Sequence, residues 1–449
     1  MSAMKRIRIG AGAGFADDRI APAVELAERG DLDYLVFECL AERTIALAQL
    51  EKLADPQAGC NEWLADRMHA VLAPCARRGT RIITNMGAAN PRAAAEVIAR
   101  IARQQGITGL RIATIIGDDV LESVRDATLP LWERDAPVQS LGNSLVSANA
   151  YLGVEPVLQA LDEGADVIIG GRIADPSMFL APLIHEFGWS RTDWDLMATG
   201  TAVGHLLECA AQLTGGYFAD PGYKDVPNLA ALGFPLAEVA ADGDFVVTKA
   251  ADTGGLVTVA TVTEQLLYEV HDPVRYVTPD VVADFSGAQL TQVEADVVAV
   301  AGIRGQRRPD TLKVSVGYLD SYIGEGQISY TGPNCVARAR QALDLVRDRL
   351  AHGGVPLTES RFELIGVDSV HRGAAPTPSV DPAEVRIRVI ARTDSLDAAR
   401  RVGHEVTALW LNGPAGGGGA VRSAVQDVAI VSTSVPRDQI TTTVEIQES

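Results

Sequence analysis

The sequence is poor in basic residues, aromatic residues and cysteine, and each shortage excludes a class of protein. Its 39 Lys and Arg stand against 58 Asp and Glu, which gives a formal net charge of −19. A field of that sign repels phosphate backbones and anionic lipid, so we expect neither nucleic acid nor a membrane as a partner. Aromatic residues make up 5% of the chain, so the core must be built mainly from Ala, Val, Leu and Ile.

The five cysteines are widely spaced and form no CxxC pair; they stand at positions 39, 60, 75, 209 and 335. This pattern argues against a disulfide framework and against a zinc cluster, and it fits a reducing compartment. The sequence also lacks a run of 18 uncharged apolar residues and the apolar core of a signal peptide. We therefore expect a cytoplasmic protein.

What the sequence has in quantity is alternation of strand and helix patterns. Apolar strand-like runs at residues 5–9, 32–38, 81–84, 111–116 and 166–169 are separated by segments with helical periodicity. Such alternation predicts a parallel sheet with flanking helices, a Rossmann-like α/β domain. Each run is followed closely by Gly, Asp, Glu or Asn, and ligands of parallel sheets bind at the carboxyl ends of the strands. We therefore expect the functional site at that edge.

A second domain is indicated by the length of 449 residues and by a change of pattern near residue 286. From there, two strand-rich stretches are each followed by one helix, which predicts a smaller α+β domain of ferredoxin-like type. We expect domain boundaries of 1–285, holding the active site, and 286–449, holding a glycine-rich loop. Before the boundary, a strand is expected at 256–262 and a helix at 264–269.

The run GAGAG at residues 10–14, with Glu38 ending the next strand, is half of a dinucleotide fingerprint. The spacing fails, because Phe15 or Asp17 stands where the third glycine is required. Asp17 also places negative charge where a pyrophosphate would dock. NAD and FAD are therefore disfavoured as cofactors, and so is an oxidoreductase function.

The segment TAVGHLLEC at residues 201–209 carries an imidazole, a carboxylate and a thiol on an apolar helix pattern. His205 and Glu208 are three residues apart, so both project from one face of a helix, with Cys209 on the same side. One interpretation is a core histidine bonded to a neighbour, with Cys209 as a small hydrophobic residue. The others are a catalytic base with its orienting acid, and two ligands of a divalent metal.

Other polar groups follow strands or turns. Asp118 and Asp119 after the fourth strand are candidates for a base or a metal ligand, or else for the cap of a helix. Lys249, ahead of a DTGG turn, offers a point charge to an anion, or is a solvated lysine.

Two glycine-containing segments are candidates for anion binding. In GGRIAD at 170–175, Gly170 and Gly171 expose backbone amides, and Arg172 offers a planar fork to a carboxylate or phosphate. Asp175 is the alternative, structural partner of Arg172. The run at 413–419 either wraps an anion with its amides or acts as a hinge.

Taken together, these segments resemble the acyclic terpene utilisation AtuA family over about residues 6–435. Two departures are the Phe-Glu pair at 37–38, where Gly-Asp is expected, and the altered Asn-x-Gly-Gly block at 85–88. The blocks that carry the resemblance are DYLVFECLAE (33–42), NMGAANP (85–91), GDD (117–119), GGRIAD (170–175), GHLLEC (204–209), TEQLLYE (263–269), YVTPD (276–280) and GPAGG (413–417).

The resemblance implies a role in breaking down branched, isoprenoid-like acids, as free acids or acyl-CoA derivatives, by a lyase or hydro-lyase. Such chemistry needs a base and a group that stabilises an oxyanion or enolate. The resemblance also implies a small partner subunit, because longer relatives carry an additional C-terminal domain; we further expect a homo-oligomer. The alternative is a non-catalytic ligand-binding or scaffold subunit of a larger complex. The predicted site comprises His205, Glu208, Asp118 and Asp119 as catalytic residues, His205 and Glu208 as the alternative metal ligands, and Arg172, Lys249, Asn85, Gly170, Gly171, Gly416 and Gly417 as substrate contacts.

Overall fold

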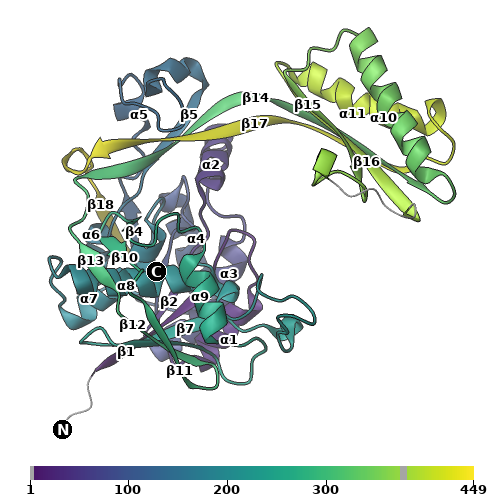
Figure 1. Ribbon diagram of the computed structural model, residues 1–449. Coiled ribbons are helices and arrows are strands. Elements are labelled where there is room, and N and C mark those ends of the chain that lie inside the picture. Colours follow the sequence, from purple (N-terminus) through teal and green to yellow (C-terminus); the bar gives the residue numbers. More distant parts are fainter. Residues whose placement is uncertain (1–4, 375–381) are drawn as a thin grey trace. The chain divides into compact units, whose positions relative to one another are not determined.

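The computed structural model describes residues 5–374 and 382–449, and the chain forms two compact units (Figure 1). The large unit comprises Met1–Gly317 with Ile430–Ser449, and the small unit comprises Tyr318–Ala429. This division differs from the expected boundary after residue 285. The reason is that strands β11 (Gln289–Glu294) and β12 (Val297–Ala301) complete the sheet of the large unit.

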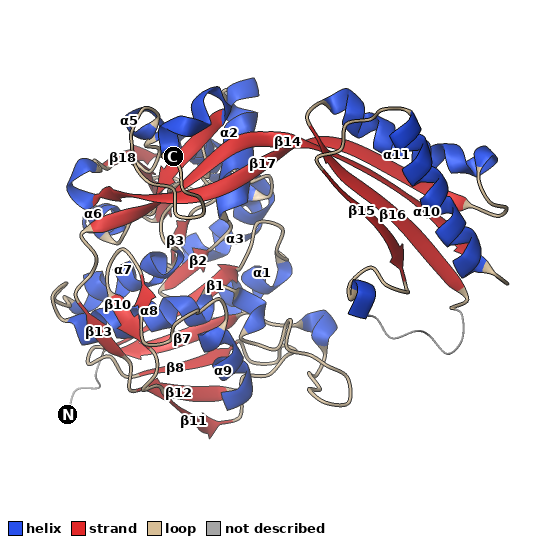
Figure 2. Ribbon diagram, turned by 45° about the horizontal axis from the view of Figure 1, so that its top comes forward, coloured by secondary structure: helices blue, strands red, loops and turns tan. Residues whose placement is uncertain are grey.

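The large unit is built on a mixed sheet of ten strands within the described ranges, several of which are visible in Figure 2. Its parallel centre is the one expected from the sequence, but antiparallel strands extend it on both sides. The chain is therefore a mixed α/β protein. The remaining strands, in spatial order after β11 and β12, are β8 (Phe245–Lys249), β7 (Pro235–Ala240), β1 (Arg6–Ala13), β2 (Tyr34–Phe37), β3 (Arg81–Thr84), β6 (Val167–Ile169), β4 (Arg111–Ile116) and β18 (Thr443–Glu448).

Two groups of helices pack against this sheet. Along the chain, the parallel strands follow one direction across the sheet from β1 to β4, and the chain then turns back to place β6 between β3 and β4. Because the crossovers are right-handed, the helices that precede this reversal and those that follow it cover opposite faces of the sheet. One group is α1 (Ala21–Arg29), α3 (Leu64–Arg78) and α4 (Pro91–Gln104); the other is α6 (Glu155–Asp162), α7 (Asp175–Phe187) and α8 (Trp194–Leu207).

Several shorter elements connect these layers. The prediction of a strand at 256–262 is wrong, because the helix α9 (Val259–Leu267) occupies most of this segment. Thr258 caps the helix by accepting a hydrogen bond from the Thr261 amide. This cap overrides the β-branched composition of the segment. The other elements are α2 (Glu42–Ala54), α5 (Leu121–Val124), β5 (Leu145–Ala150), β9 (Tyr276–Val277), β10 (Val282–Asp284), β13 (Arg304–Gln306) and the 3-10 turn η2 (Ala210–Gln212).

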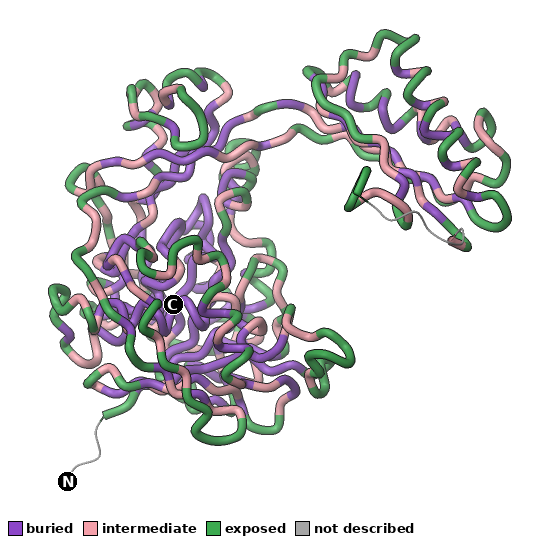
Figure 3. Tube along the Cα trace, viewed as in Figure 1, coloured by how far each residue is buried: buried purple, intermediate pink, exposed green. Residues whose placement is uncertain are grey.

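Small aliphatic side chains fill the centre of the large unit, where Figure 3 shows the buried segments gathered. All four residues of β2 are buried, and so are all three residues of β6. A strand that is buried on both faces has a continuous run of apolar residues, and this pattern is why the sequence predicted these strands.

The small unit has its own core, which includes Ile328, Val346, Ile387 and Val406. Its strands are ordered β15–β16–β14–β17, and the chain order strand, helix, strand, strand, helix, strand is that of the ferredoxin-like motif. β14 and β17 each continue into the large unit. The elements are β14 (Thr311–Thr331), α10 (Cys335–His352), β15 (Glu359–Ile365), β16 (Glu384–Thr393), α11 (Leu396–Asn412) and β17 (Gly418–Pro436).

A search of the described residues finds no helix with the length and hydropathy needed to cross a membrane.

Candidate active site at the carboxyl edge of the parallel strands

A cavity of about 920 Å³ opens in the large unit beside the carboxyl ends of β1, β2 and β6. Gly14 follows β1, Glu38 follows β2, and Arg172 follows β6, so three strand ends contribute to its wall. This is the edge at which a ligand site was expected. The other polar side chains of the lining include Asp17, Asp18, Glu42, Thr44, Tyr151, Asp175, Glu208, Cys209, Gln212, Tyr268, Glu269, Tyr276, Thr278, Thr311, Lys313 and Ser434.

Glu38 is held by the residues around it. Its Oε1 accepts hydrogen bonds from the Leu40 amide at 2.7 Å and from Asn85 Nδ2 at 3.2 Å. Asn85 in turn accepts from the Cys39 amide at 2.8 Å. Asn85 is fully buried and is not part of the cavity lining. The structure thus places Asn85 behind Glu38 as a positioning residue.

Arg172 is the buried cation of the cavity. It pairs with Asp175, donates to the carbonyls of Leu40 and Ile173, and lies 4.6 Å from the centre of the Tyr151 ring. Among the described atoms, its Nε is buried without a hydrogen-bond partner. Most of the guanidinium is therefore committed to the protein, and its contribution to a ligand is mainly its positive charge.

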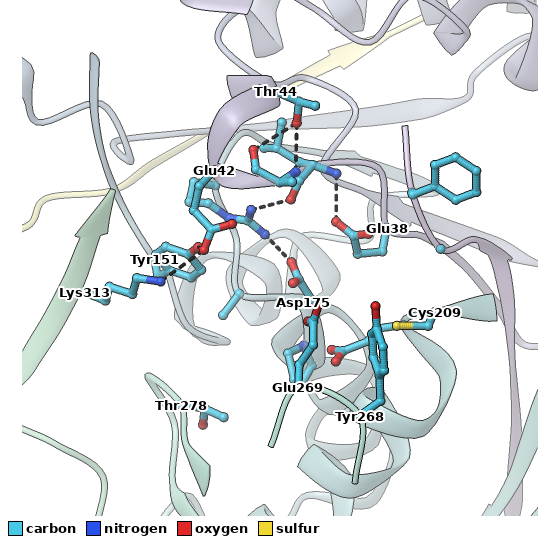
Figure 4. A pocket seen from close by; sticks show the side chains of 18 of the residues that line it. Glu38, Glu42, Thr44, Tyr151, Asp175, Cys209, Tyr268, Glu269, Thr278 and Lys313 are labelled. Carbon is cyan, nitrogen blue, oxygen red and sulfur yellow. Dashed lines mark hydrogen bonds and ion pairs between the residues drawn. The ribbon is translucent and has the colours of Figure 1, made fainter. Parts of the chain in front are cut away.

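Lys313 supplies a second cation on the same side as Tyr151. Glu42 joins them, accepting from the Tyr151 hydroxyl at 2.6 Å and from Lys313 Nζ at 3.0 Å. Figure 4 shows these three side chains together on one side of the cavity, with Cys209 and Tyr268 on the other. The Lys313 side chain is 36% exposed, so it can reach a ligand.

His205 and Glu208 form the contact that the helix spacing predicted, but they differ in access. His205 Nδ1 lies 2.8 Å from Glu208 Oε1, and its Nε2 lies 3.1 Å from the Leu266 carbonyl oxygen. The imidazole is 1% exposed and packs against Tyr276 and Phe285, which also contact each other, whereas Glu208 lines the cavity. His205 therefore lies behind Glu208 and does not face the cavity.

The hydrogen bonds of His205 fix its protonation pattern. A carbonyl oxygen only accepts, so Nε2 carries a proton that it donates to Leu266. Nδ1 then shares one further proton with Glu208 Oε1. Because both ring nitrogens are engaged, the geometry does not suit His205 as a metal ligand. Within the described part of the chain, no group of three or more His, Cys, Asp or Glu side chains is arranged to hold a metal ion.

Three carboxyl groups of the cavity hold protons more tightly than usual. Burial raises the pKa of Glu38 well above its ordinary range, and the nearby Asp175 adds to this. Burial raises the pKa of Asp175 to about 7, with the Arg172 charge opposing it and Glu208 reinforcing it. Burial likewise raises the pKa of Glu208, against the effect of His205. A pKa near 7 suits Asp175 to general acid–base catalysis, and the raised pKa values of Glu38 and Glu208 make them candidates for the same role.

The remaining predicted residues lie outside the cavity lining. Buried Asp118 accepts hydrogen bonds from the Arg172 amide and from Asn149 Nδ2, and exposed Asp119 accepts from the Leu121 amide. Neither acid is the helix cap that was weighed from the sequence, because the N-cap of α5 is Val120. Lys249 donates to the Thr253 carbonyl at 2.9 Å and pairs with Asp296 at 3.3 Å.

The glycines that were predicted to bind substrate are sites of close packing. A Cβ on Gly170 would lie 2.7 Å from Ile173 Cδ1, and one on Gly171 would lie 2.5 Å from Asp118 Oδ2. Gly416 and Gly417 belong to the small unit, where a Cβ on Gly417 would lie 3.0 Å from Ile328 Cδ1. None of the four is in the cavity lining.

Several residues of the cavity were not singled out from the sequence. Asp175 was considered only as the partner of Arg172, and Glu38 only as the acid of a dinucleotide site. Tyr268, Glu269 and Tyr276 lie within the blocks TEQLLYE and YVTPD, which were noticed only as family resemblance. Their meeting depends on the loops after α9, which local sequence does not place.

The sequence profile of the family described as "Acyclic terpene utilisation family protein AtuA" matches residues 7–446, nearly the whole chain. The chain belongs to this family. No curated protein matches the chain. Among solved structures, a homoserine dehydrogenase from Thiobacillus denitrificans is 11% identical, with 90% of this chain and 84% of that chain covered and a TM-score of 0.15. A score that low supports no inference about fold or function. The family assignment links this AtuA-family protein to the use of acyclic terpenes.

Proposed function

We propose that this AtuA-family protein is a lyase or hydro-lyase in the breakdown of acyclic terpenes. Its substrate would be a branched, hydroxylated carboxylic acid or the CoA thioester of such an acid. The observation that carries the proposal is the set of buried carboxyl groups with raised pKa values, Glu38, Asp175 and Glu208, which share one cavity with Arg172. The family assignment supports the proposal only as far as a role in the use of acyclic terpenes.

The reaction requires one group to take a proton and another to return it. In a dehydration, a base removes the proton next to the carbonyl and an acid protonates the departing hydroxyl; in a carbon–carbon cleavage, the base takes the hydroxyl proton. Glu208 is the group we assign to proton transfer, because its Oε2, within the described residues, is buried without a partner. His205, bonded to the other oxygen, exchanges a proton with it from behind.

The remaining groups orient the substrate and balance its charge. With a pKa of about 7, Asp175 holds a proton in part of the molecules at neutral pH and is suited to protonate the leaving group. The charge of Arg172 stabilises the oxyanion or enolate that develops, which is a large effect in a cavity of low dielectric constant. Lys313, beside Glu42 and Tyr151 in the cavity wall, is the cation available to the substrate carboxylate.

The test is turnover of branched 3-hydroxyacyl substrates by the purified protein, with and without the substitution Glu208→Gln. Because the amide cannot exchange a proton, we expect kcat to fall about 10²- to 10⁴-fold. The matched control is Glu264→Gln, which removes an exposed carboxylate on α9 that pairs with Lys224. Substrate consumption by Glu208→Gln at the unmodified rate would exclude Glu208 from catalysis. Binding without turnover by the unmodified protein would favour the alternative of a non-catalytic ligand-binding subunit.

A further inference from the structure

A second hollow of about 910 Å³ in the large unit gathers arginine side chains. Its lining includes Arg191 from the loop before α8, Arg307 and Arg308 from the loop between β13 and β14, and Arg437 from the turn after β17. We call it the arginine hollow. Four guanidinium groups in one hollow are unexpected in a chain whose net charge is −19. Such a local reversal of sign gathers anions that the rest of the surface repels.

Within the lining of the hollow, the arginines outnumber the acids. Glu155, the first residue of α6, is shared by three of the arginines: it is bonded to Arg308 and lies 3.4 Å from Arg191 and 3.7 Å from Arg437. Arg307 pairs with Asp310 at 2.6 Å. The lining itself carries Asp310 and Asp438 against its four arginines, and Glu155 and the buried Asp280 add negative charge from behind it.

Arg437 is the most constrained of the four. It donates to the Pro279 carbonyl, and its Nε is buried and, among the atoms that the structure describes, has no hydrogen-bond partner. Burial and the charge of Arg308 lower the pKa of Arg437, against the effect of Glu155. An anion that binds between like charges held this closely reduces their mutual repulsion.

The arginine hollow adjoins the candidate active site. Pro309 lines the cavity, while its chain neighbours Arg308 and Asp310 line the hollow. Pro279, whose carbonyl accepts from Arg437, also lines the cavity. Pro309 and the bonded pair of Pro279 and Arg437 thus form a wall that the two spaces share. One elongated ligand could occupy both.

We propose that the arginine hollow binds the phosphate groups of the substrate's carrier. The acyl end of a thioester would lie in the cavity and the phosphorylated end, as in coenzyme A, in the hollow. Arginine suits this task, because its planar fork matches phosphate oxygens. Trp194, a half-buried residue of the lining, adds an aromatic face for the base of a nucleotide. The inference rests on the proposed function for the identity of its ligand and selects the CoA thioester over the free acid.

The test is calorimetric binding of coenzyme A, pantetheine and inorganic pyrophosphate to the full chain. We choose Arg191→Gln, because this side chain is half-exposed and its removal leaves Arg308 bonded to Glu155. Loss of one charge-assisted contact should weaken coenzyme A binding about tenfold and leave pantetheine unaffected. The matched control is Arg304→Gln, which removes a neighbouring exposed arginine that pairs with Asp195 outside the hollow. The control should bind coenzyme A like the unmodified protein.

A second variant separates a ligand site from a structural cluster. Glu155→Gln removes the anion that three arginines share while preserving its shape, so coenzyme A should bind several-fold more tightly. A purely structural cluster would give a lower melting temperature and no gain in affinity. Equal binding of coenzyme A by the unmodified protein and Arg191→Gln, or binding of pyrophosphate that coenzyme A does not displace, would overturn the proposal.

The outcomes also distinguish this inference from the proposed function. Coenzyme A binding that depends on Arg191, without turnover of any acyl-CoA, would support the phosphate site and count against the lyase. Equal kcat/KM for pantetheine and CoA thioesters would retain the lyase and overturn the phosphate site.

Discussion

His205 is a buried histidine with both ring nitrogens bonded and its ring packed against two aromatic rings. Its substitution therefore affects the fold as well as any proton transfer. We expect His205→Ala to lower the free energy of unfolding by about 2–4 kcal/mol, because it leaves a cavity and an unpaired Leu266 carbonyl. Chemical denaturation measures the change. His271→Ala, at an exposed histidine, is the control and should change stability by less than about 0.5 kcal/mol.

Glu38 gives a prediction about pH. Its raised folded-state pKa means that the folded protein keeps a proton that the unfolded chain releases, so this residue makes stability fall as pH rises above about 4. Glu38→Gln mimics the protonated form and keeps an acceptor for the Leu40 amide. We expect the variant's melting temperature, relative to the unmodified protein, to increase from pH 5 to pH 8.

Glu42 provides the opposite case as a control. The pKa of Glu42 is lowered to about 2; burial opposes this, and the Tyr151 hydroxyl and Lys313 outweigh burial. Its stabilising effect is complete above its unfolded pKa and is lost only as pH falls toward 2. Glu42→Gln should therefore lower the melting temperature by the same amount at pH 5 and pH 8. A pH-independent difference for Glu38→Gln would contradict the burial of its proton.

For single residues, the sequence predicted which side chains contact each other, but it did not predict which of them face the cavity. The spacing of His205 and Glu208 predicted their contact, because helix geometry is local. Which of the two faces the cavity depends on Tyr276 in β9 and Phe285 directly after β10, both distant in sequence. Lys249 and Lys313 are similar in isolation. Only the pairing of β14 with β5 brings Lys313 beside Tyr151 and into the cavity wall.

Among the elements, the close packing of the end of β1 against the backbone just before η2 positions one end of the candidate site. Gly14 follows β1, and a Cβ there would lie 2.4 Å from the carbonyl carbon of Cys209. Backbone at that distance cannot yield as a flexible side chain would. We expect Gly14→Ala to cost about 1–3 kcal/mol of stability and to raise KM, because the displaced segment carries Glu208.

Thermal denaturation and steady-state kinetics together test this element. The control is Gly418→Ala, since Gly418 has ordinary backbone geometry and open space around its Cβ position. An unchanged melting temperature for Gly14→Ala would show that η2 can move away without cost. The glycine run at 10–14 thus has a packing explanation in place of the dinucleotide fingerprint that it half resembles.

The elements that sequence predicted well are those with complete local signals. The buried strands and α4, with Asn90 as its cap and Pro91 as its first residue, follow from periodicity and capping. The helix pattern at 201–209 was expected to include Cys209, but α8 ends at Leu207, so Cys209 lies beyond it.

In the whole chain, the residues that line the cavity are distinct from the residues that form the small unit. Every residue of the cavity lining and of the arginine hollow belongs to the large unit. The sequence placed the change of pattern near 286, where strands begin to dominate. The long-range pairing of β12 with β8 assigns the first of those strands to the large unit, and such pairing is invisible to local patterns.

This separation predicts that the large unit folds and binds ligand without residues 318–429. β14 leaves the large unit and β17 returns to it, and a Cβ on Gly317 would lie 3.6 Å from Ile430 Cδ1, so the two ends are adjacent. A flexible linker of about four residues is long enough to join them. We expect the shortened chain to unfold cooperatively and to bind coenzyme A within about threefold of the full chain. The expectation is contradicted if circular dichroism shows a folded large unit that no longer binds, because the small unit would then contribute to the ligand site.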